Sequence, residues 1–384
     1  MPSKRGYLAF VPYWSSLRSL GQYIVLEFDN RHDSLISRKP EVHVMTEKGR
    51  ALWVLAFLSP IIAELLSGSS PPLEFFNPIS FALLLGLYGA GVLVVRELAV
   101  MWRLGWMGII VLGAAYGILE EGVAIKSFFD PFWMDLGGLG EYGRYVGTNW
   151  VWAVWLTIYH SMISITLPIL ITWLLYPNLR NTRLTNFSSF GALLVILLLD
   201  VVVCTLLLNR FVPFIPMWLL AVAAVFGLTY YAKHIPRGFM MPREDHPTWS
   251  PFKFAVLGFL MISLDFLLAG AFAGTSVPPI VPVILMLVVA AFTVTCIRDF
   301  MGRGNNEPQV AAFISGPLAF FVVLGLFLEL GGILGMSVVA IVTAVFIVDL
   351  NRWARGRKVI VFRVWKLLHG RRVSAPVAVT AWEK

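Results

Sequence analysis

The stretch WMGIIVLGAAYGILEEGVAIK, residues 106–126, contains the features that decide the fold of this chain. Residues 106–119 carry no charged side chain, which is typical of a helix inside a lipid bilayer. Two adjacent carboxylates, Glu120 and Glu121, follow, and Lys126 ends the stretch. Because a helix needs about 20 residues to cross the hydrocarbon core, both glutamates fall within the predicted membrane span.

The remainder of the sequence is similarly apolar. Of its 384 residues, 58% are hydrophobic and 14% are charged, and the mean hydropathy is +0.78. Since soluble domains carry about 25% charged residues, the composition predicts an all-α, polytopic transmembrane helical bundle. About ten apolar runs are long enough to cross the membrane. They lie near residues 51–67, 79–102, 106–126, 148–175, 188–209, 213–233, 252–273, 277–299, 309–329 and 331–350.

The net charge of +8 is concentrated in alternate loops and at the ends of the chain. Lys and Arg in short loops mark the cytoplasmic side, so both termini are expected to be cytoplasmic. This distribution favours a topology signal over a nucleic-acid partner. The sequence therefore predicts an integral, multi-pass protein of a prokaryotic plasma membrane, with the lipid bilayer as its partner and an oligomeric state that is left open. The basic loop residues are Arg103, Arg180, Arg183, Lys233, Arg237, Arg243, Arg298 and Arg303.

The two ends of the chain differ from its centre. Residues 1–44 are mixed in charge and show no clear period, which predicts a poorly ordered extension before a bundle spanning 45–350. Met45 is itself a plausible start of the natural protein. Residues 351–384 form a basic cytoplasmic tail that alternates cationic and bulky apolar residues, so it is either an amphipathic helix on anionic lipid or an ordinary tail.

Ionisable side chains inside membrane spans cost about 2.5–3.5 kcal/mol each, which makes them candidates for function. Glu64, Lys126 and Glu329 lie near span ends, where they are expected to reach the headgroups. Arg96 and Glu97 are expected to form a structural ion pair with a neighbouring helix. The set comprises Glu64, Arg96, Glu97, Glu120, Glu121, Lys126, His160, Asp200, Asp265 and Glu329.

His160 is the only histidine of six that falls within a predicted span. Thr157, Ser161 and Ser164 share its helix face at spacings of three and four residues. This polar face requires a polar partner or water.

The helix that carries the glutamates offers such a partner. Gly113, Gly117 and Glu121 are spaced by four, and small residues at that spacing let another helix approach closely. Adjacent residues differ by about 100° around a helix, so we expect one glutamate to point at His160. The other is expected to bind a second helix, a water molecule, Arg144 or Lys126.

These residue types suggest two kinds of site chemistry. A carboxylate beside an imidazole can hold a water molecule and accept its proton. Two carboxylates and one imidazole also suit zinc, although the chain has no His-Glu-x-x-His motif. No organic cofactor is expected, and metal binding is left open.

The double glutamate followed by a lone histidine in the next helix resembles the CAAX protease and bacteriocin-processing family of intramembrane proteases. The resemblance covers roughly residues 106–176. In that family an arginine follows the glutamates, where this chain has Ile125 and then Lys126. An aromatic residue stands four positions before the histidine, where this chain has Leu156 beside Trp155. The third family motif, a histidine followed four residues later by Asn or Asp, has no counterpart in a span.

The resemblance implies a glutamate-dependent peptidase that acts on a membrane peptide. Glu120 or Glu121 would be the general base, and His160 would bind the water or stabilise the oxyanion. The alternative is a ten-span transporter or channel that uses the same three residues to couple protons or cations. The aromatic loop 127–152 is expected to roof a cavity in either case. Further candidates for the substrate site or cavity lining are Arg144, Asn149, Ser164, Asp200 and Asp265.

Overall fold

The computed structural model describes residues 45–236, 246–302, 304–357 and 359. Within these residues, nine helices are long and apolar enough to cross a membrane. Each coincides with a run expected from the sequence, so the prediction of a polytopic helical bundle is confirmed. They are Pro78–Met101, Trp106–Ala124, Trp150–Leu175, Phe187–Leu208, Ile215–His234, Pro251–Gly270, Ile280–Phe300, Glu307–Leu330 and Met336–Ala354.

The tenth expected span is also helical. α1 (Glu47–Pro60) continues into the π-helical turn η1 (Ile61–Leu65), and together they cover most of the first apolar run. Its charged residues lie near its two ends, where Glu47, Lys48 and Arg50 precede the apolar stretch and Glu64 follows it.

Several spans combine α-helical and π-helical turns. Wide π-turns are rare and occur frequently at functional sites.

Between η1 and the β1–β2 hairpin, the elements are α2 (Pro72–Phe75), α3 (Pro78–Leu84), η2 (Leu85–Gly89), α4 (Ala90–Met101), α5 (Trp106–Gly117), η3 (Ile118–Ala124) and the 3₁₀ turn η4 (Gly137–Leu139). Then follow β1 (Arg144–Tyr145), β2 (Thr148–Asn149), α6 (Trp150–Tyr159), η5 (His160–Thr166), α7 (Leu167–Leu175), η6 (Pro177–Leu179), α8 (Phe187–Val203) and η7 (Cys204–Leu208). The last are α9 (Ile215–His234), α10 (Pro251–Gly270), α11 (Ile280–Phe300), α12 (Glu307–Leu330) and α13 (Met336–Ala354).

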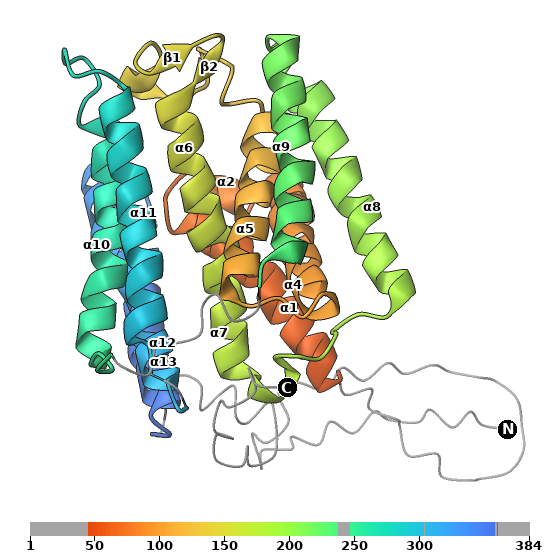
Figure 1. Cartoon of the computed structure of the whole chain (residues 1–384), viewed down its shortest axis with the longest axis vertical. Helices are drawn as coiled ribbons and strands as arrows, with labels where there is room; N and C mark the ends of the chain where they lie inside the picture. Colours follow the sequence, from red (N-terminus) through yellow and green to blue (C-terminus); the bar gives the residue numbers. More distant parts are fainter. Residues whose placement is uncertain (1–44, 237–245, 303, 358, 360–384) are drawn as a thin grey trace, which may run out of the picture.

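The helices form three groups side by side (Figure 1). α10 to α13 lie on one side, α8 and α9 lie on the other, and α1, α4, α5, α6 and α7 lie between them. The start of α1 and the end of α13 are at the same end of the bundle, while the β1–β2 hairpin is at the opposite end. This arrangement agrees with an even number of crossings. The cytoplasmic side of the bundle remains a prediction from the basic loops.

Asparagine side chains cap the first turns of two helices, α6 and α8. Asn149 accepts a hydrogen bond from the Trp152 backbone N–H at 3.0 Å, and Asn186 accepts one from Ser189 at 2.8 Å. These caps satisfy backbone donors that lack a partner inside the helix. The positions of α6 and α8 are therefore set by local sequence as well as by hydrophobicity.

Arg96 and Glu97 form the expected structural ion pair, but their common partner is a loop. Arg96 donates to the Leu179 carbonyl at 2.6 Å. Glu97 accepts from the Leu184 backbone at 3.0 Å and from the Thr185 hydroxyl at 2.8 Å. Both side chains are almost fully buried, so the pair holds the α7–α8 connection against α4.

The loop that joins η3 to α6 is tightly packed at the hairpin end of the bundle. Four apolar residues of this loop are buried, namely Phe128, Phe129, Leu136 and Leu139. The extension 1–44, most of the basic tail 351–384, and the basic residues Arg237, Arg243 and Arg303 lie outside the described residues. The first residues of that tail continue α13 to Ala354.

Candidate functional site

Glu120, Glu121 and His160 meet in the half of the central helices that is nearer the β1–β2 hairpin. A Glu120 carboxylate oxygen lies 3.1 Å from His160 Nδ1, and a Glu121 oxygen lies 3.2 Å from Nε2. The side chains of Glu120 and His160 are each 2% exposed, and that of Glu121 is 13% exposed. The structure thus brings together the three residues that the sequence singled out.

Our expectation that only one glutamate would point at His160 is wrong. The two carboxylates contact opposite edges of the same imidazole ring. Both glutamates stand in the π-helical turn η3, and His160 begins the π-helical turn η5. The step of about 100° between adjacent residues holds for a regular α-helix, whereas π-turns change the positions of side chains around the helix.

Two glycines let the histidine helix approach. A Cβ added to Gly113 would lie 2.9 Å from Ser161 Cα, and one added to Gly117 would lie 2.9 Å from His160 Cβ. Neither position has room for a larger side chain without movement. The spacing of Gly113 and Gly117 therefore does what small residues at four-residue intervals are expected to do in membranes.

Neighbouring hydroxyl groups orient His160 and Glu121. The Ser164 hydroxyl lies 2.9 Å from His160 Nδ1, and the Ser127 hydroxyl donates to Glu121. Trp152 donates its indole N–H to Ser127 at 3.0 Å. Glu121 is thereby tied to the loop that covers it.

Lys126 and Arg144 were candidate partners for the second glutamate. Neither forms an ion pair with Glu120 or Glu121. Lys126 donates to the carbonyls of Thr205 at 2.8 Å and Phe211 at 2.9 Å, and also to the Asn209 carbonyl. This places a cation at the C-terminal end of η7, where exposed carbonyls favour it. Burial lowers the pKa of Lys126, and the charge of Asp130 partly offsets that shift.

A cavity of about 350 Å³ adjoins the three residues. This volume falls within the usual range for ligand pockets, about 300–1,000 Å³. Ser69 and Asp135, which are exposed, mark where its lining reaches the surface. The pKa of Asp135 is raised, chiefly by desolvation and next by the negative charge of Glu121. The wall consists of Ala63, Glu64, Ser67, Gly68, Ser69, Leu84, Tyr88, Glu120, Glu121, Ile125, Trp133, Asp135, Trp152, Trp155, Leu156, Tyr159, His160 and Phe266.

Glu64 is a third carboxylate of this cavity. It accepts hydrogen bonds from the Tyr88 hydroxyl and from the Ser70 hydroxyl, the latter at 2.9 Å. The expectation that Glu64 reaches the headgroups is therefore wrong. A position near the end of a span does not show which way the side chain of Glu64 points.

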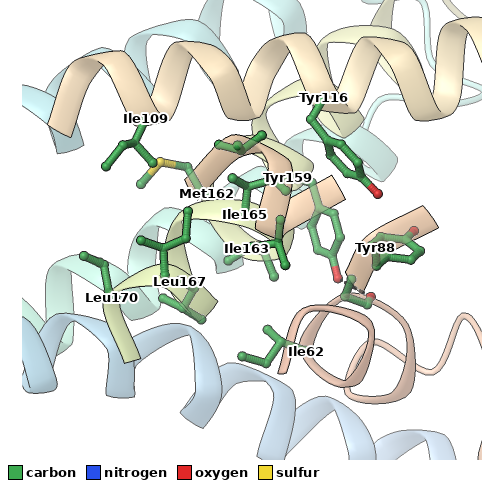
Figure 2. Close-up of a cluster of buried hydrophobic side chains, with 14 of the residues drawn as sticks. Ile62, Tyr88, Ile109, Tyr116, Tyr159, Met162, Ile163, Ile165, Leu167 and Leu170 are labelled. Atoms are coloured by element: carbon green, nitrogen blue, oxygen red, sulfur yellow. Dashed lines mark hydrogen bonds between the residues drawn. The ribbon is translucent and has the colours of Figure 1, made fainter. Parts of the chain in front are cut away.

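Three tyrosines surround His160. The ring centroids of Tyr159, Tyr88 and Tyr116 lie 5.3, 6.0 and 6.5 Å from that of His160. Figure 2 shows the three tyrosines gathered at one end of a cluster that continues through Ile163 and other buried apolar residues. Sequence reasoning missed these tyrosines because they come from three different spans.

The model of a protein family described as "Uncharacterized membrane protein family" matches residues 53–368. This chain belongs to that family. No curated protein and no solved structure matches it. The match covers the bundle from within α1 to the end of α13, so the site described above lies inside the matched part.

None of the five further candidate residues lines the cavity, so that prediction is wrong. Ser164 contacts His160 but is not part of the cavity wall. Arg144 donates to the carbonyls of Gly140 and Phe129, at 3.0 and 2.8 Å. Asn149 donates to the Leu139 carbonyl at 2.6 Å and caps α6. Both residues therefore stabilise the loop over the site and do not face the cavity.

The two buried aspartates also lie away from this cavity. Asp200 stands opposite Gly86, where an added Cβ would lie 2.8 Å from its carboxylate. Neither carboxylate oxygen of Asp265 has a hydrogen-bond partner among the described residues. Neither aspartate pairs with Arg96, which binds Glu97 and the α7–α8 connection.

Two buried polar atoms at the cavity wall also lack hydrogen-bond partners within the described part of the chain. They are the indole nitrogen of Trp155 and the Oε2 atom of Glu120. Glu120 Oε2 is the atom near His160 Nδ1, but the contact lacks hydrogen-bond geometry. Two residues of the wall therefore each hold one buried polar atom, an N–H donor and a carboxylate acceptor, without a partner among the described residues.

The same residues have the composition of a metal site. One ligand atom from each of Glu120, Glu121 and His160 lies within 4.8 Å of the other two. Carboxylate and imidazole groups are suitable ligands for zinc.

Proposed function

We propose that this protein is an intramembrane hydrolase that cleaves peptide bonds with a water molecule activated by Glu121 and His160. The observation that carries the proposal is the contact of two carboxylates with one imidazole at the wall of a 350 Å³ cavity. Such groups can hold a water molecule and accept its proton at hydrogen-bond distance.

The two glutamates have different environments, which suggests different roles. Glu121 is the more exposed, at 13% against 2%, and its second oxygen is held by Ser127. It is the better candidate for the general base. Glu120 is buried against Nδ1 of His160 and would stabilise the positive charge that the ring acquires when it takes up a proton.

The chemical step requires one water molecule and no redox partner. Glu121 accepts a proton from water, and the water oxygen forms a bond to the carbonyl carbon of the substrate. The C–N bond then breaks, and the proton passes to the departing amine. The products are a carboxylate and an amine.

The developing negative charge on the carbonyl oxygen needs a donor. Trp155 lines the cavity, and its buried indole N–H has no hydrogen-bond partner among the described residues. Donors placed at the developing oxyanion provide a large part of catalysis in acyl transfer. We assign this role to Trp155.

A resemblance to the CAAX protease and bacteriocin-processing family supports the same chemistry through Glu120, Glu121 and His160. The chain departs from that pattern at Ile125 and Leu156. Trp155, next to Leu156, supplies an aromatic group at the cavity wall.

The transporter alternative would use the same three residues to carry protons or cations. It places Asp200 and Asp265 along the pathway, but neither lines the cavity. The cavity is also larger than a proton or a bare ion requires. The geometry therefore gives the hydrolase more support.

Cleavage can be tested with the full chain in liposomes and a library of synthetic single-span peptides in water enriched in oxygen-18. A hydrolase should leave one oxygen-18 atom in each new carboxyl terminus. Glu121→Gln and His160→Ala should lose cleavage, while Glu74→Gln, an exposed glutamate on α2, should retain it. Proton flux in the same liposomes without cleavage would favour the transporter instead.

A further inference from the structure

The cavity has an unbalanced charge. Glu64, Glu120 and Glu121 line its wall and Asp135 lies where it reaches the surface, yet none of its lining residues is Lys or Arg. His160 is the one lining group that can become cationic, and it is already between two carboxylates. A partner of opposite charge stabilises the ionised form of a carboxylate in surroundings of low polarity.

Glu64 shows this deficit most directly. Its two oxygens accept hydrogen bonds only from the neutral hydroxyls of Tyr88 and Ser70 among the described residues. No Lys, Arg or His nitrogen of the described chain lies within 4.0 Å of it. An ionised carboxylate has about four lone-pair positions, so Glu64 can accept about two more hydrogen bonds.

Glu120 provides a second and independent observation. It is 2% exposed and lines the cavity, and its Oε2 atom has no hydrogen-bond partner within the described residues. A buried, unpartnered acceptor costs about 1–3 kcal/mol unless a ligand or water satisfies it. The cavity thus presents acceptors of negative charge on two sides.

Aromatic rings form much of the remaining wall. Trp155 lies in edge contact with Trp152, with ring centroids 5.0 Å apart, and with Phe266 at 5.1 Å. Trp133 and Tyr159 complete this group. Faces of aromatic rings attract cations within about 6 Å, and Trp is the most favourable.

We propose that this cavity binds the ammonium or guanidinium group of a Lys or Arg side chain in the peptide substrate, with Glu64 as the principal recognition residue. The proposal rests on the proposed function, because the peptide is the molecule that is hydrolysed. Primary ammonium and guanidinium groups have N–H donors that can occupy the remaining positions on Glu64. A quaternary ammonium headgroup of a lipid has no such donor, so the hydrogen bonding favours the peptide side chain.

The test uses the purified full chain in detergent and four small probes. n-Butylammonium and n-propylguanidinium represent Lys and Arg, choline represents a lipid headgroup, and 1-butanol is the neutral control. Affinity is measured by calorimetry and by the shift of the unfolding temperature. Butylammonium and propylguanidinium should bind and raise the unfolding temperature, and 1-butanol should not.

Glu64→Gln should weaken binding of both cations about tenfold or more, since a charge-assisted hydrogen bond is lost. Glu74→Gln removes an exposed carboxylate and should leave binding unchanged. The comparison of butylammonium with 1-butanol on the unmodified chain remains decisive if Glu64→Gln does not fold. Equal effects of these two probes, unchanged affinity in Glu64→Gln, or tighter binding of choline than of both N–H donors would each overturn the proposal.

The cation site and the proposed function can fail separately. Binding that depends on Glu64, in a protein that cleaves no peptide, would support the cation site and remove the hydrolase. Cleavage that depends on Glu121, with no preference for Lys or Arg in the products and no binding of the probes, would do the reverse.

Discussion

Gly117 and His160 are in direct contact between neighbouring helices, since a Cβ on Gly117 would lie 2.9 Å from the Cβ of His160. The same added atom would lie 3.4 Å from Thr157 Cα. The Cβ of His160 and the backbone beside it, and not the flexible tip of a side chain, therefore limit the size of residue 117. This contact fixes how closely the imidazole approaches the glutamates.

Gly117→Ala should consequently lower stability although alanine favours a helix. Overpacking typically costs about 1–3 kcal/mol, which exceeds the gain of about 1 kcal/mol from replacing a helical glycine. Gly227→Ala is the matched control, because a Cβ there meets nothing within 4 Å. Unfolding in detergent should give a lower midpoint for Gly117→Ala than for the unmodified chain and for Gly227→Ala. Equal midpoints for all three would show that the two helices can separate freely at this point.

The spans can be predicted from the sequence because a bilayer of fixed thickness requires long apolar runs, and this signal is local. A site that includes Glu120, Glu121 and His160 can also be predicted, because ionisable residues are costly inside a span. Gly113 and Gly117 add to this prediction, because small residues spaced by four let another helix approach closely.

The rest of the site depends on long-range geometry that periodicity does not contain. Glu120, Glu121 and His160 all lie in π-helical turns. The spacing of apolar residues does not predict where such turns occur. Glu64 and Tyr88 are 24 residues apart and meet only in the folded bundle. Arg144 has the charge of a site residue, but loop carbonyls bind its guanidinium.

Trp155→Phe should separate catalysis from packing. The substitution keeps an aromatic ring at the cavity wall but removes the five-membered ring with the N–H group that has no partner among the described residues. If this donor stabilises the oxyanion, kcat should fall by about 10²–10³ with little change in KM. Trp53→Phe, at a position 45% exposed on α1, is the control and should leave both constants unchanged. A larger effect on KM than on kcat would assign Trp155 to substrate binding.

Lys126→Met should reduce stability without acting on the chemical step. The ammonium group satisfies three carbonyls at the end of η7, and its loss leaves those acceptors without their donor. A buried unsatisfied group costs about 1–3 kcal/mol, so the unfolding midpoint should fall clearly. Lys48→Met, at an exposed position in the first turn of α1, should have little effect. If Lys126→Met unfolds like the unmodified chain, the carbonyls must find water or another donor.

Removal of metal distinguishes two ways of activating water at the same residues. With both edges of His160 in contact with carboxylates, the proposed mechanism uses Glu121 as the base and requires no ion. Cleavage of the peptide library should therefore survive dialysis against EDTA, and metal analysis should find no ion in stoichiometric amount. Loss of cleavage that zinc restores would mean that the ion activates the water, since zinc lowers the pKa of bound water to about 7. In that case Glu120→Gln should also lose zinc, which mass spectrometry under native conditions would detect directly.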